Sequence, residues 1–220
     1  HLGAWSCQAD ARSGSIGSDR VARKARRKTC REHSGSRAPT LAPCVKNLAM
    51  SDTSLPTPAT PPFSSDDFRA AMGQFATGVT IVTAIDADGR KVGLTANSFN
   101  SVSLSPPLVL WSLSKQSSSM PGLRSAKAWA VNILSADQRL LAERFARKGV
   151  DRFDGVAWRT GLSGAPLIDG AVATFECTPR SHHDEGDHLI FVGEVTHCAR
   201  RLGALPLLYH GGRFFTDLPF

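Results

Sequence analysis

The stretch GLTANSFNSVSLSPPLVLWSLS, residues 93–114, contains the pattern that decides the fold of this chain. Runs rich in β-branched and apolar residues open and close it, and NSVSL (100–104) lies between them as a third short run. Each run has the length of a strand, and Pro106 and Pro107 interrupt the last two. Short strands this closely spaced, with no helix between them, predict antiparallel pairing.

Further strands are expected on both sides of this stretch. VTIVTAI (79–85) precedes it, and DADG (86–89) supplies a turn into KVGLTA (91–96). The runs that follow are AWAVNIL (128–134), AVATFECTP (171–179), HLIFVGEVTHCA (188–199) and LPLLYHGGRFF (205–215). Many strands with only two or three helices, and no regular βαβ alternation, predict a mainly β chain, an antiparallel β-barrel with a few flanking helices.

Two amphipathic helices are expected to flank the strands. Ser64 or Ser65 can cap the first, which would end near Gly78. The second would begin after Ser135 and continue to about Ala146. The apolar face of the first helix would consist of Phe68, Met72 and Phe75.

Positive charge is concentrated at the beginning of the chain. Residues 1–49 hold ten Lys or Arg and three acidic residues, whereas residues 50–220 hold sixteen of each sign. The net charge of +7 therefore belongs to the first segment, and the neutral remainder gives no reason to expect a nucleic-acid partner. The sequence also lacks an apolar run of about 18 residues, so no membrane partner is expected.

The chain divides into three segments by composition. Residues 1–49 have no apolar period, and we expect a disordered basic extension there. One hypothesis makes it translated upstream sequence with Met50 as the natural start, and the alternative is an arm that binds nucleic acid or acidic lipid. Residues 50–64 contain four prolines and would form a stiff linker, and residues 65–220 would form one domain.

The cysteines indicate no disulfide framework and no zinc site, because no CxxC spacing occurs. In a hairpin whose paired residue numbers sum to roughly 370, Cys177 faces Gly193 and Cys198 faces Val172, too far apart for a disulfide. Both thiols are expected to be buried or half-buried. A reducing cytoplasm is the expected location.

None of the common catalytic or nucleotide-binding motifs is present, neither GxSxG, HExxH, a P-loop nor GxGxxG after a strand. The informative segment is residues 93–114, whose middle, TANSFNS (95–101), combines small residues with hydroxyl and amide groups that could bond the edge of a planar heterocycle such as a flavin. Hydroxyls and a cation nearby could hold a phosphate. The simpler alternative is a polar β-loop followed by a serine-rich turn. The candidates for the phosphate are Ser112, Ser114, Lys115, Ser117 and Ser118.

Several motifs occur in an order that resembles the short-chain flavin reductase family, the reductase components of two-component flavin monooxygenases. The resemblance covers residues 68–215, nearly all of the expected domain. The motifs are FATGVTIVT, GLTANSFNSVSLSPPLVLWSL, DRFDGVAWRTGLSGAPLIDGAVATFEC, GDHLIFVGEV and PLLYHGGRF.

The resemblance implies a split β-barrel that binds FMN or FAD, a homodimer with sites near the subunit interface, and reduction of flavin by NADH or NADPH. The reduced flavin would diffuse to a partner monooxygenase. Stacked rings suffice for hydride transfer, so no catalytic triad is required. It also implies roles for residues: Thr95, Ala96, Asn97 and Ser98 at the isoalloxazine; Ser112, Ser117 and Ser118 near the ribityl phosphate; Lys148 and Arg152 on the outer phosphate or adenylate side.

The segment RSHHDEGDHLIFVGEV, residues 180–195, leaves three alternatives. The register above sets His182 opposite His188, where two imidazoles and a carboxylate could bind a metal. Adjacent histidines point to opposite faces of a strand, however, so no metal site is predicted, and a solvated hairpin tip is the second alternative. The third follows from the family's GDH pattern, in which the histidine contacts the nicotinamide. Here that pattern is Gly186, Asp187 and His188, with Gly186 adopting positive φ and Asp187 orienting the imidazole.

Two rival functions fit the same barrel. One is a related split-barrel oxidase acting on a phosphorylated vitamin. The other is a flavin- or haem-binding carrier or sensor without turnover. Loss of NADH absorbance on mixing with flavin would indicate a reductase, and bound colour without turnover would indicate a carrier.

Overall fold

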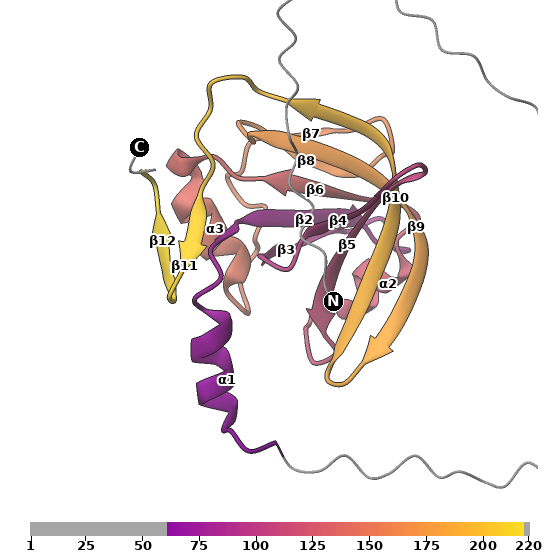
Figure 1. Ribbon diagram of the computed structural model, residues 1–220. Helices are drawn as coiled ribbons and strands as arrows, with labels where there is room; N and C mark the ends of the chain where they lie inside the picture. The colour runs from indigo at the N-terminus through magenta and orange to yellow at the C-terminus, as the bar shows by residue number, and fades with distance from the viewer. Residues whose placement is uncertain (1–60, 218–220) are drawn as a thin grey trace, which may run out of the picture. The chain divides into compact units, whose positions relative to one another are not determined.

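The computed structural model describes residues 61–217, and its main feature is one antiparallel sheet of seven strands in the order β3-β2-β6-β9-β10-β5-β4 (Figure 1). The mainly β, barrel-like fold class predicted from the sequence is confirmed. Residues 1–49, most of the expected linker, and Cys7, Cys30 and Cys44 lie outside the described residues. The strands are β2 (Thr80–Ile85), β3 (Lys91–Ala96), β4 (Asn100–Leu104), β5 (Pro107–Ser114), β6 (Trp129–Ile133), β9 (Ala173–Glu185) and β10 (His188–Arg200).

Two small sheets complete the β-structure. A three-stranded sheet has the order β1-β11-β12, and a two-stranded hairpin pairs β7 with β8. The sequence reasoning assigned no strand to β1, β7 or β8, which have only two or three residues each and are too short for an alternating pattern. Their bounds are β1 (Thr77–Gly78), β7 (Trp158–Thr160), β8 (Pro166–Ile168), β11 (Leu208–His210) and β12 (Arg213–Phe215).

Strands β9 and β10 form a long hairpin with a two-residue turn, Gly186–Asp187. Gly186 has φ of 56°, as expected for glycine at the first position of such a turn. His188 pairs with Glu185, and His182 pairs with Phe191. The expected pairing of His182 with His188 is therefore wrong, because the turn is centred between Gly186 and Asp187, so that paired residue numbers near the tip sum to 373.

The same register corrects the expectation for the cysteines. Cys177 pairs with Val195 and Cys198 with Phe175, and both are free thiols. Cys177 is fully buried as expected, and burial raises the pKa of its thiol to about 12. Cys198 is exposed, so the expectation of a half-buried thiol is wrong there. Cys198 lies near the open end of the hairpin, far from the turn, where residues 196–200 of β10 are exposed.

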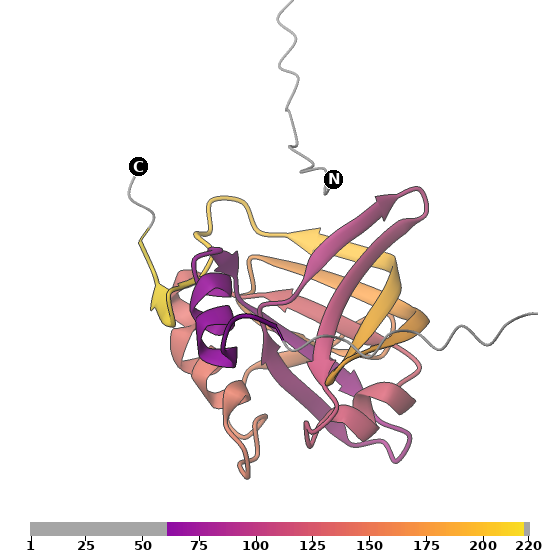
Figure 2. The same cartoon turned by 60° about the horizontal axis from the view of Figure 1, so that its bottom comes forward.

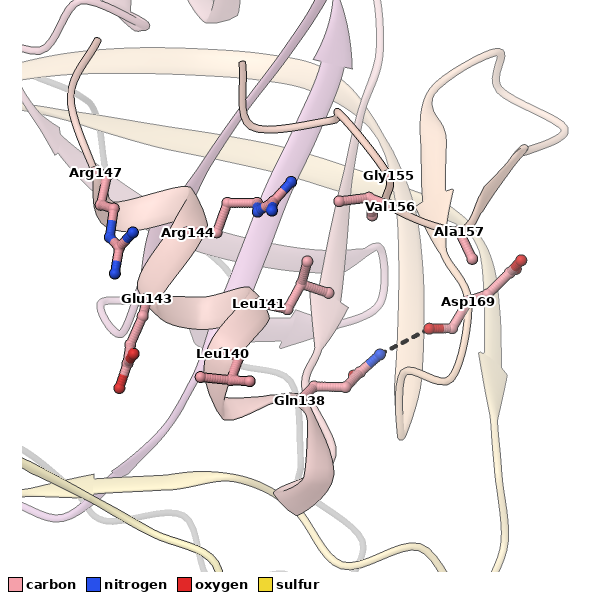
Figure 3. A pocket seen from close by; sticks show the side chains of 10 residues that line it. All are labelled: Gln138, Leu140, Leu141, Glu143, Arg144, Arg147, Gly155, Val156, Ala157 and Asp169. Carbon is pink, nitrogen blue, oxygen red and sulfur yellow. Dashed lines mark hydrogen bonds between the residues drawn. The ribbon is translucent and has the colours of Figure 1, made fainter. Parts of the chain in front are cut away.

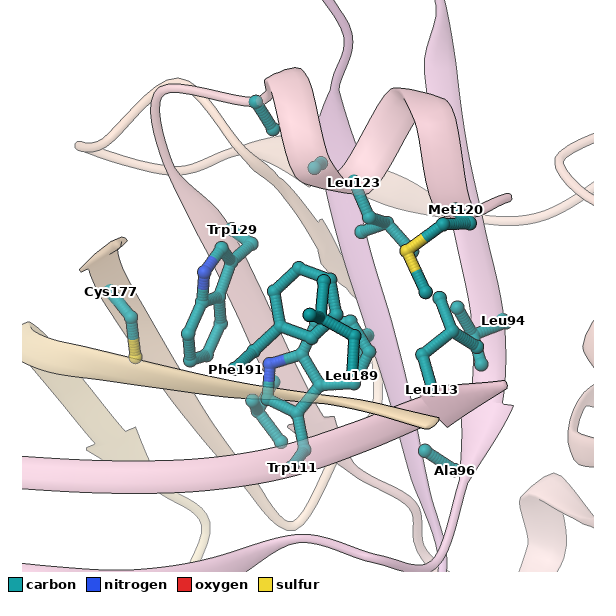
Figure 4. Packing of buried hydrophobic residues seen from close by; sticks show 14 of the residues in the cluster. Leu94, Ala96, Trp111, Leu113, Met120, Leu123, Trp129, Cys177, Leu189 and Phe191 are labelled. Atoms are coloured by element: carbon teal, nitrogen blue, oxygen red, sulfur yellow. The ribbon is translucent and has the colours of Figure 1, made fainter. Parts of the chain in front are cut away.

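Aromatic rings fill the centre of the barrel (Figure 4). Trp111 of β5 stacks on Phe191 of β10 with ring centroids 4.2 Å apart, and Trp129 of β6 meets Trp111 edge-on at 5.7 Å. All three side chains are completely buried. Helix α2 (Met120–Ser125) covers one end of this core with Met120 and Leu123. The sequence reasoning did not predict this helix of six residues.

A hydroxyl links the segment after β3 to strand β5. The Oγ of Ser98 donates to the carbonyl oxygen of Ser112 and accepts from its N–H, both at 3.0 Å. Asn100 pairs with Leu110 in the ladder between β4 and β5, so this side chain continues the same register two residues further and ties the segment after β3 to β5. The β4–β5 hairpin, drawn in magenta, projects beyond the rest of the sheet (Figure 2).

The β7–β8 hairpin lies over the outer face of the sheet and is held there by three buried polar side chains. Thr83 of β2 donates to the carbonyl oxygen of Pro166 at 2.5 Å, and the Oδ1 of Asn132 in β6 accepts from the N–H of Ile168 at 2.8 Å. Glu176 of β9, only 5% exposed, accepts from the N–H of Ser163 at 2.6 Å. Each central strand thus supplies one bond to this hairpin.

The two expected helices are present. Helix α1 (Ser65–Met72) is capped at its N-terminus by Ser64, whose side chain forms a capping box with Asp67. It ends at Gly73 and not near Gly78, because the chain turns there into β1. None of its residues is buried. Ser135 caps a short 3-10 segment, Ala136–Gln138, which continues into α3 (Arg139–Ala146) as predicted.

In residues 61–217 no helix combines the length and the apolar character needed to cross a membrane.

Candidate functional site

The serine-rich segment after β5 folds into a tight turn that leads into α2. The N–H of Ser117 donates to the carbonyl oxygen of Ser114 at 2.9 Å, and the N–H of Met120 donates to that of Ser117 at 3.0 Å. The N–H of Ser119 donates to the Oγ of Ser117 at 3.3 Å. Hydroxyl groups therefore gather at the point where β5 ends.

This turn forms one wall of a cleft of about 300 Å³. The opposite wall comes from β3, the end of α3 and the loop that follows α3. The lining contains two cationic side chains and several hydroxyls but no carboxylate, a composition that favours an anion. The lining residues are Leu94, Thr95, Leu113, Ser114, Gln116, Ser117, Ser118, Phe145, Ala146, Lys148 and Arg152.

Arg152 is fixed at the inner side of this cleft by neutral acceptors. Its Nη1 donates to the carbonyl oxygen of Gly93 and to the Oγ of Ser119, each at 2.7 Å, and its Nε and Nη2 donate to the carbonyl oxygen of Arg147. Burial lowers the pKa of Arg152, but a guanidinium remains charged at neutral pH. Within residues 61–217 neither Arg152 nor Lys148 forms an ion pair, so both charges remain uncompensated.

A smaller cleft of about 200 Å³ adjoins the first and shares Ser118 and Arg152 with it. Lys91 lies at this second cleft, with its Nζ over the rings of Phe153 and Trp158 at 5.4 and 4.7 Å from their centroids. Unlike the first cleft, the second one also contains a carboxylate, that of Asp151, beside Lys91 and Arg152.

The TANS segment, residues 95–98, does not present its four residues on one wall. The Oγ1 of Thr95 donates to the carbonyl oxygen of Ala142 at 2.6 Å, and Thr95 lines the cleft described above. Ala96 is buried, since successive residues of β3 point to opposite faces. Asn97 and Ser98 line a separate groove of about 570 Å³ between the barrel and α1.

His188 begins β10 at the hairpin tip. Its Nδ1 lies 2.7 Å from the Oδ1 of Asp187, and its side chain is 46% exposed. The hydrogen bond and the charge of His188 lower the pKa of Asp187. His188 pairs with Ser114, the last residue of β5, so the hairpin tip lies beside the strand end that leads to the serine turn.

The structure thus gathers part of the predicted set. Thr95, Ser117, Ser118, Lys148 and Arg152 line one cleft, and Gly186, Asp187 and His188 form the tip next to the end of β5. Ser112 lies in β5 outside the cleft lining and is bonded through its backbone to Ser98.

Gln116 and Ser119 were missed in the sequence reasoning. Both belong to the same polar run as Ser117 and Ser118, and this continuity was the available signal. Their roles differ because the turn points Gln116 to the cleft and Ser119 to Arg152.

Another cavity, of about 510 Å³, lies between α3 and the segment around Gly155 (Figure 3). The Nε2 of Gln138 donates to the carbonyl oxygen of Asp169 at its edge, at 2.7 Å. None of the predicted site residues lines it. This cavity is larger than the cleft beside the serine turn, but neither the serine turn nor the hairpin tip lines it. The cleft is therefore the better candidate for the functional site.

Residues 72–216 match the family described as flavin reductase like domain. This chain belongs to the flavin reductase-like family. The family identified from the ordered motifs is therefore confirmed.

Two named reductases are similar to this chain in sequence, and one solved structure is similar to it in fold. FMN reductase (NADH) SmoA of Agrobacterium fabrum is 50% identical over 151 residues, 69% of this chain and 85% of that protein. The reductase subunit HsaB of a flavin-dependent monooxygenase from Rhodococcus jostii is 38% identical over 147 residues, 67% of this chain and 75% of that protein. The NADH:FAD oxidoreductase SgcE6 of Streptomyces globisporus, solved with NAD and FAD fragments, aligns with a TM-score of 0.68 and 43% identity over 74% of this chain and 98% of that one.

The hydrogen-bond donors of the cleft fit a flavin nucleotide, the ligand implied by membership of the flavin reductase-like family. A flavin nucleotide needs an anion site for its phosphate and an apolar wall for its ring. Ser117, Ser118, Lys148 and Arg152 provide donors and positive charge without a competing carboxylate. The apolar wall consists of Leu94, Leu113, Phe145 and Ala146.

Proposed function

We propose that this chain is an NADH-dependent flavin reductase that transfers hydride to FMN or FAD. The observation that carries the proposal is that a carboxylate-free cleft with two uncompensated cations lies at the end of β5, the same strand end that pairs with the hairpin tip bearing His188. Membership of the flavin reductase-like family and the printed activities of its relatives support it.

We propose that the serine turn and the two cations hold the flavin phosphate. Ser117 and Ser118 would donate hydrogen bonds, while Lys148 and Arg152 would supply charge. Because Arg152 is already held by four hydrogen bonds, it would lose little side-chain entropy on binding. The adjoining cleft that shares Arg152 leaves room for the adenylate half of FAD, so both flavins remain candidates.

The isoalloxazine would lie toward residues 95–98. Thr95 is the member of this segment that lines the phosphate cleft, whereas Ala96 is buried and its carbonyl oxygen accepts a hydrogen bond from Thr80. Asn97 and Ser98 face the groove beside α1, so they would reach the ring from the other side of the loop. Ser112 would act indirectly, by holding Ser98 in place.

The nicotinamide would contact the hairpin tip. His188 presents a flat ring that is half exposed and fixed by Asp187 at 2.7 Å, as stacking on a nicotinamide requires. Gly186 gives the turn its positive φ. NADH is the proposed donor because two of the similar proteins carry NADH in their names, and NADPH is tested beside it.

The nicotinamide and the flavin would together supply the redox chemistry, as hydride donor and hydride acceptor. The protein's part is to hold the two rings in contact and to exclude other orientations. Such positioning lowers the entropic cost of bringing the two rings together. The hydride transfer itself needs no acid or base from the chain.

The proposed partner is a flavin-dependent monooxygenase that receives the reduced flavin by diffusion, as suggested by the resemblance to the reductase subunit HsaB. We also propose a homodimer, since large apolar side chains are exposed beside the α1 groove. The proposed location is the cytoplasm, where NADH is available.

The test is a turnover assay with each flavin and each nicotinamide. Rapid loss of absorbance at 340 nm with NADH and excess FMN or FAD is the expected result. Bound flavin without turnover would replace the proposal with a carrier, and a lack of both binding and turnover would exclude a flavin function.

A further inference from the structure

Lys115 connects the hairpin tip to the serine turn through three bonds. Its Nζ donates to the carbonyl oxygen of Gly186 at 3.0 Å and lies 2.9 Å from the Oδ1 of Asp184. Its backbone N–H donates to the carbonyl oxygen of Asp187 at 2.9 Å. One residue therefore binds the carbonyl groups of both turn residues and the carboxylate at the end of β9.

These contacts direct the ammonium group of Lys115 away from the phosphate cleft. Lys115 is not among the residues that line the cleft, although its neighbours Ser114 and Gln116 are. The hydrogen bond and the charge of Lys115 lower the pKa of Asp184, as expected for a carboxylate that remains ionised beside an ammonium group. The sequence suggested Lys115 as a phosphate ligand, and the geometry gives it another role.

The bonds of Lys115 matter because the tip is ordinarily the most mobile part of a β-hairpin. The turn residues lie beyond the ladder between β9 and β10, which begins at the pair Glu185 and His188. A tip held only at its base would sample many positions. The backbone of His188 is held by pairing with Glu185 and Ser114, but its imidazole is oriented by Asp187, which belongs to the turn. Fixing the turn therefore fixes the partner of the imidazole.

We propose that Lys115 is a positioning residue that fixes the His188 tip to the serine turn and so sets the distance between the nicotinamide side and the flavin side of the site. The proposal rests on the proposed function. Lys115 itself would touch neither flavin nor nicotinamide.

The experiment compares Lys115→Met, which keeps the length of the side chain but removes the donor, with Lys115→Arg and with the control Lys127→Met. Lys127 is exposed between α2 and β6 and, among residues 61–217, forms no ion pair. The measurements are hydrogen exchange of the backbone amides of residues 184–189, the KM for NADH, and the flavin Kd from fluorescence titration.

In Lys115→Met we expect faster exchange at the tip and an increase in the KM for NADH of roughly 3- to 10-fold, as for the loss of one or two partly exposed hydrogen bonds. The flavin Kd should change less than about twofold, since no cleft residue is altered. In Lys115→Arg, which keeps a donor, the exchange rate of the tip and the KM for NADH should remain close to those of the wild type. Lys127→Met should resemble the wild type.

Two failures can be told apart. If the wild type does not oxidise NADH with either flavin, the proposed function fails, whereas the exchange measurement still reports whether Lys115 holds the tip. If the wild type turns over and Lys115→Met leaves both the tip exchange and the KM unchanged, the positioning role is wrong. A weaker flavin Kd in Lys115→Met, with tip exchange unchanged, would make Lys115 a flavin ligand and overturn the proposal.

Discussion

At the scale of single residues, His188 depends on its own neighbour for its orientation. Asp187 holds the Nδ1 of His188 at 2.7 Å, which leaves Nε2 and the ring face free for a ligand. The other histidines of the hairpin are engaged differently. The ring of His182 meets Phe191 edge-on at 4.8 Å, and the Nε2 of His183 lies 3.0 Å from the Oγ of Ser181.

The substitution His188→Ala is expected to raise the KM for NADH or to slow flavin reduction, because the nicotinamide loses a stacking surface. The flavin Kd should remain nearly the same, since His188 is not part of the cleft. Steady-state kinetics with NADH and a flavin titration measure the two effects. His183→Ala is the matched control on the same hairpin, and unaltered NADH kinetics in His188→Ala would refute its role.

The substitution Gly193→Ala is expected to destabilise the barrel by about 1–3 kcal/mol, the usual cost of overpacking a core. A Cβ at this position would lie 2.3 Å from Cζ2 of Trp129 and 3.2 Å from Cβ of Cys177. Trp129 cannot move away easily because it is completely buried against Trp111. Urea unfolding measures the change, and Gly203→Ala, where no atom lies within 4 Å, tests strain from positive φ alone.

The sequence predicted the residue types of the site better than their contacts. The serine run and the basic residues near 148–152 were recognised as candidates, and they do meet in one cleft. Sequence order could not reveal that Arg152 bonds to Ser119, because the two residues meet only when α2 and the loop after α3 pack together. Alternation along β3 likewise separates Thr95 from its neighbours.

At the scale of elements, the β7–β8 hairpin depends on polar bonds more than on apolar area. Its apolar contact with the sheet is the small cluster of Ala130, Ala165 and Leu167. Glu176 is the charged member of the polar anchor. Burial raises its pKa, but hydrogen bonds from the Ser163 and Leu162 segment outweigh burial, so the pKa lies below its ordinary value.

A carboxyl group whose pKa is lowered by folding stabilises the folded state above its unfolded pKa, and this contribution is lost as the pH falls through the folded pKa. Glu176→Gln should therefore lower the free energy of unfolding by about 1–3 kcal/mol at pH 7, because buried N–H donors lose a charged acceptor. The difference from the wild type should shrink as the pH falls below the ordinary pKa of a glutamate toward the lowered pKa of Glu176, because the wild-type carboxyl then protonates.

Denaturant unfolding at pH 7 and at pH 3.5 measures this dependence. Glu194→Gln serves as the control, since it removes a surface ion pair with Arg180 on the same sheet. A pH-independent loss of stability in Glu176→Gln would argue against an ionised carboxylate at this position.

The starts of the long strands were predicted to within two residues, whereas β1, β7, β8 and α2 were not predicted. Strand β10 was expected at 188–199 and spans His188–Arg200. The partner strand β9 was expected to end at 179 but continues to Glu185, since hydrogen bonding with β10 imposes strand structure on polar residues such as His182. Pairing of this kind depends on a distant segment and is not encoded in local composition.

At the scale of the whole molecule, the apolar face of α1 has no cover among the described residues. Phe68 and Met72 of α1, and Phe75 in the turn that follows the helix, are 54%, 57% and 71% exposed. The predicted amphipathic helix is present, but its apolar face does not pack into the core of this protomer. A second copy is the proposed cover.

Phe75→Glu is expected to shift the protein from dimer toward monomer, because a buried charge opposes association of apolar faces. Sedimentation velocity over a range of concentrations measures the mass. Leu202→Glu, at a residue 79% exposed elsewhere on the chain, is the control for added charge. An unchanged mass in Phe75→Glu would remove α1 from the interface.

The tryptophans of the core provide the protein with its own optical probe. Trp111 and Trp129 are fully buried, while Trp158 is partly exposed beside Lys91, which lines the second cleft. Indole emission overlaps the near-ultraviolet absorption of oxidised flavin, so a flavin in the cleft would quench these tryptophans by energy transfer. Flavin binding could then be followed by tryptophan fluorescence, without nicotinamide and without an added label, and separately from every later step of turnover.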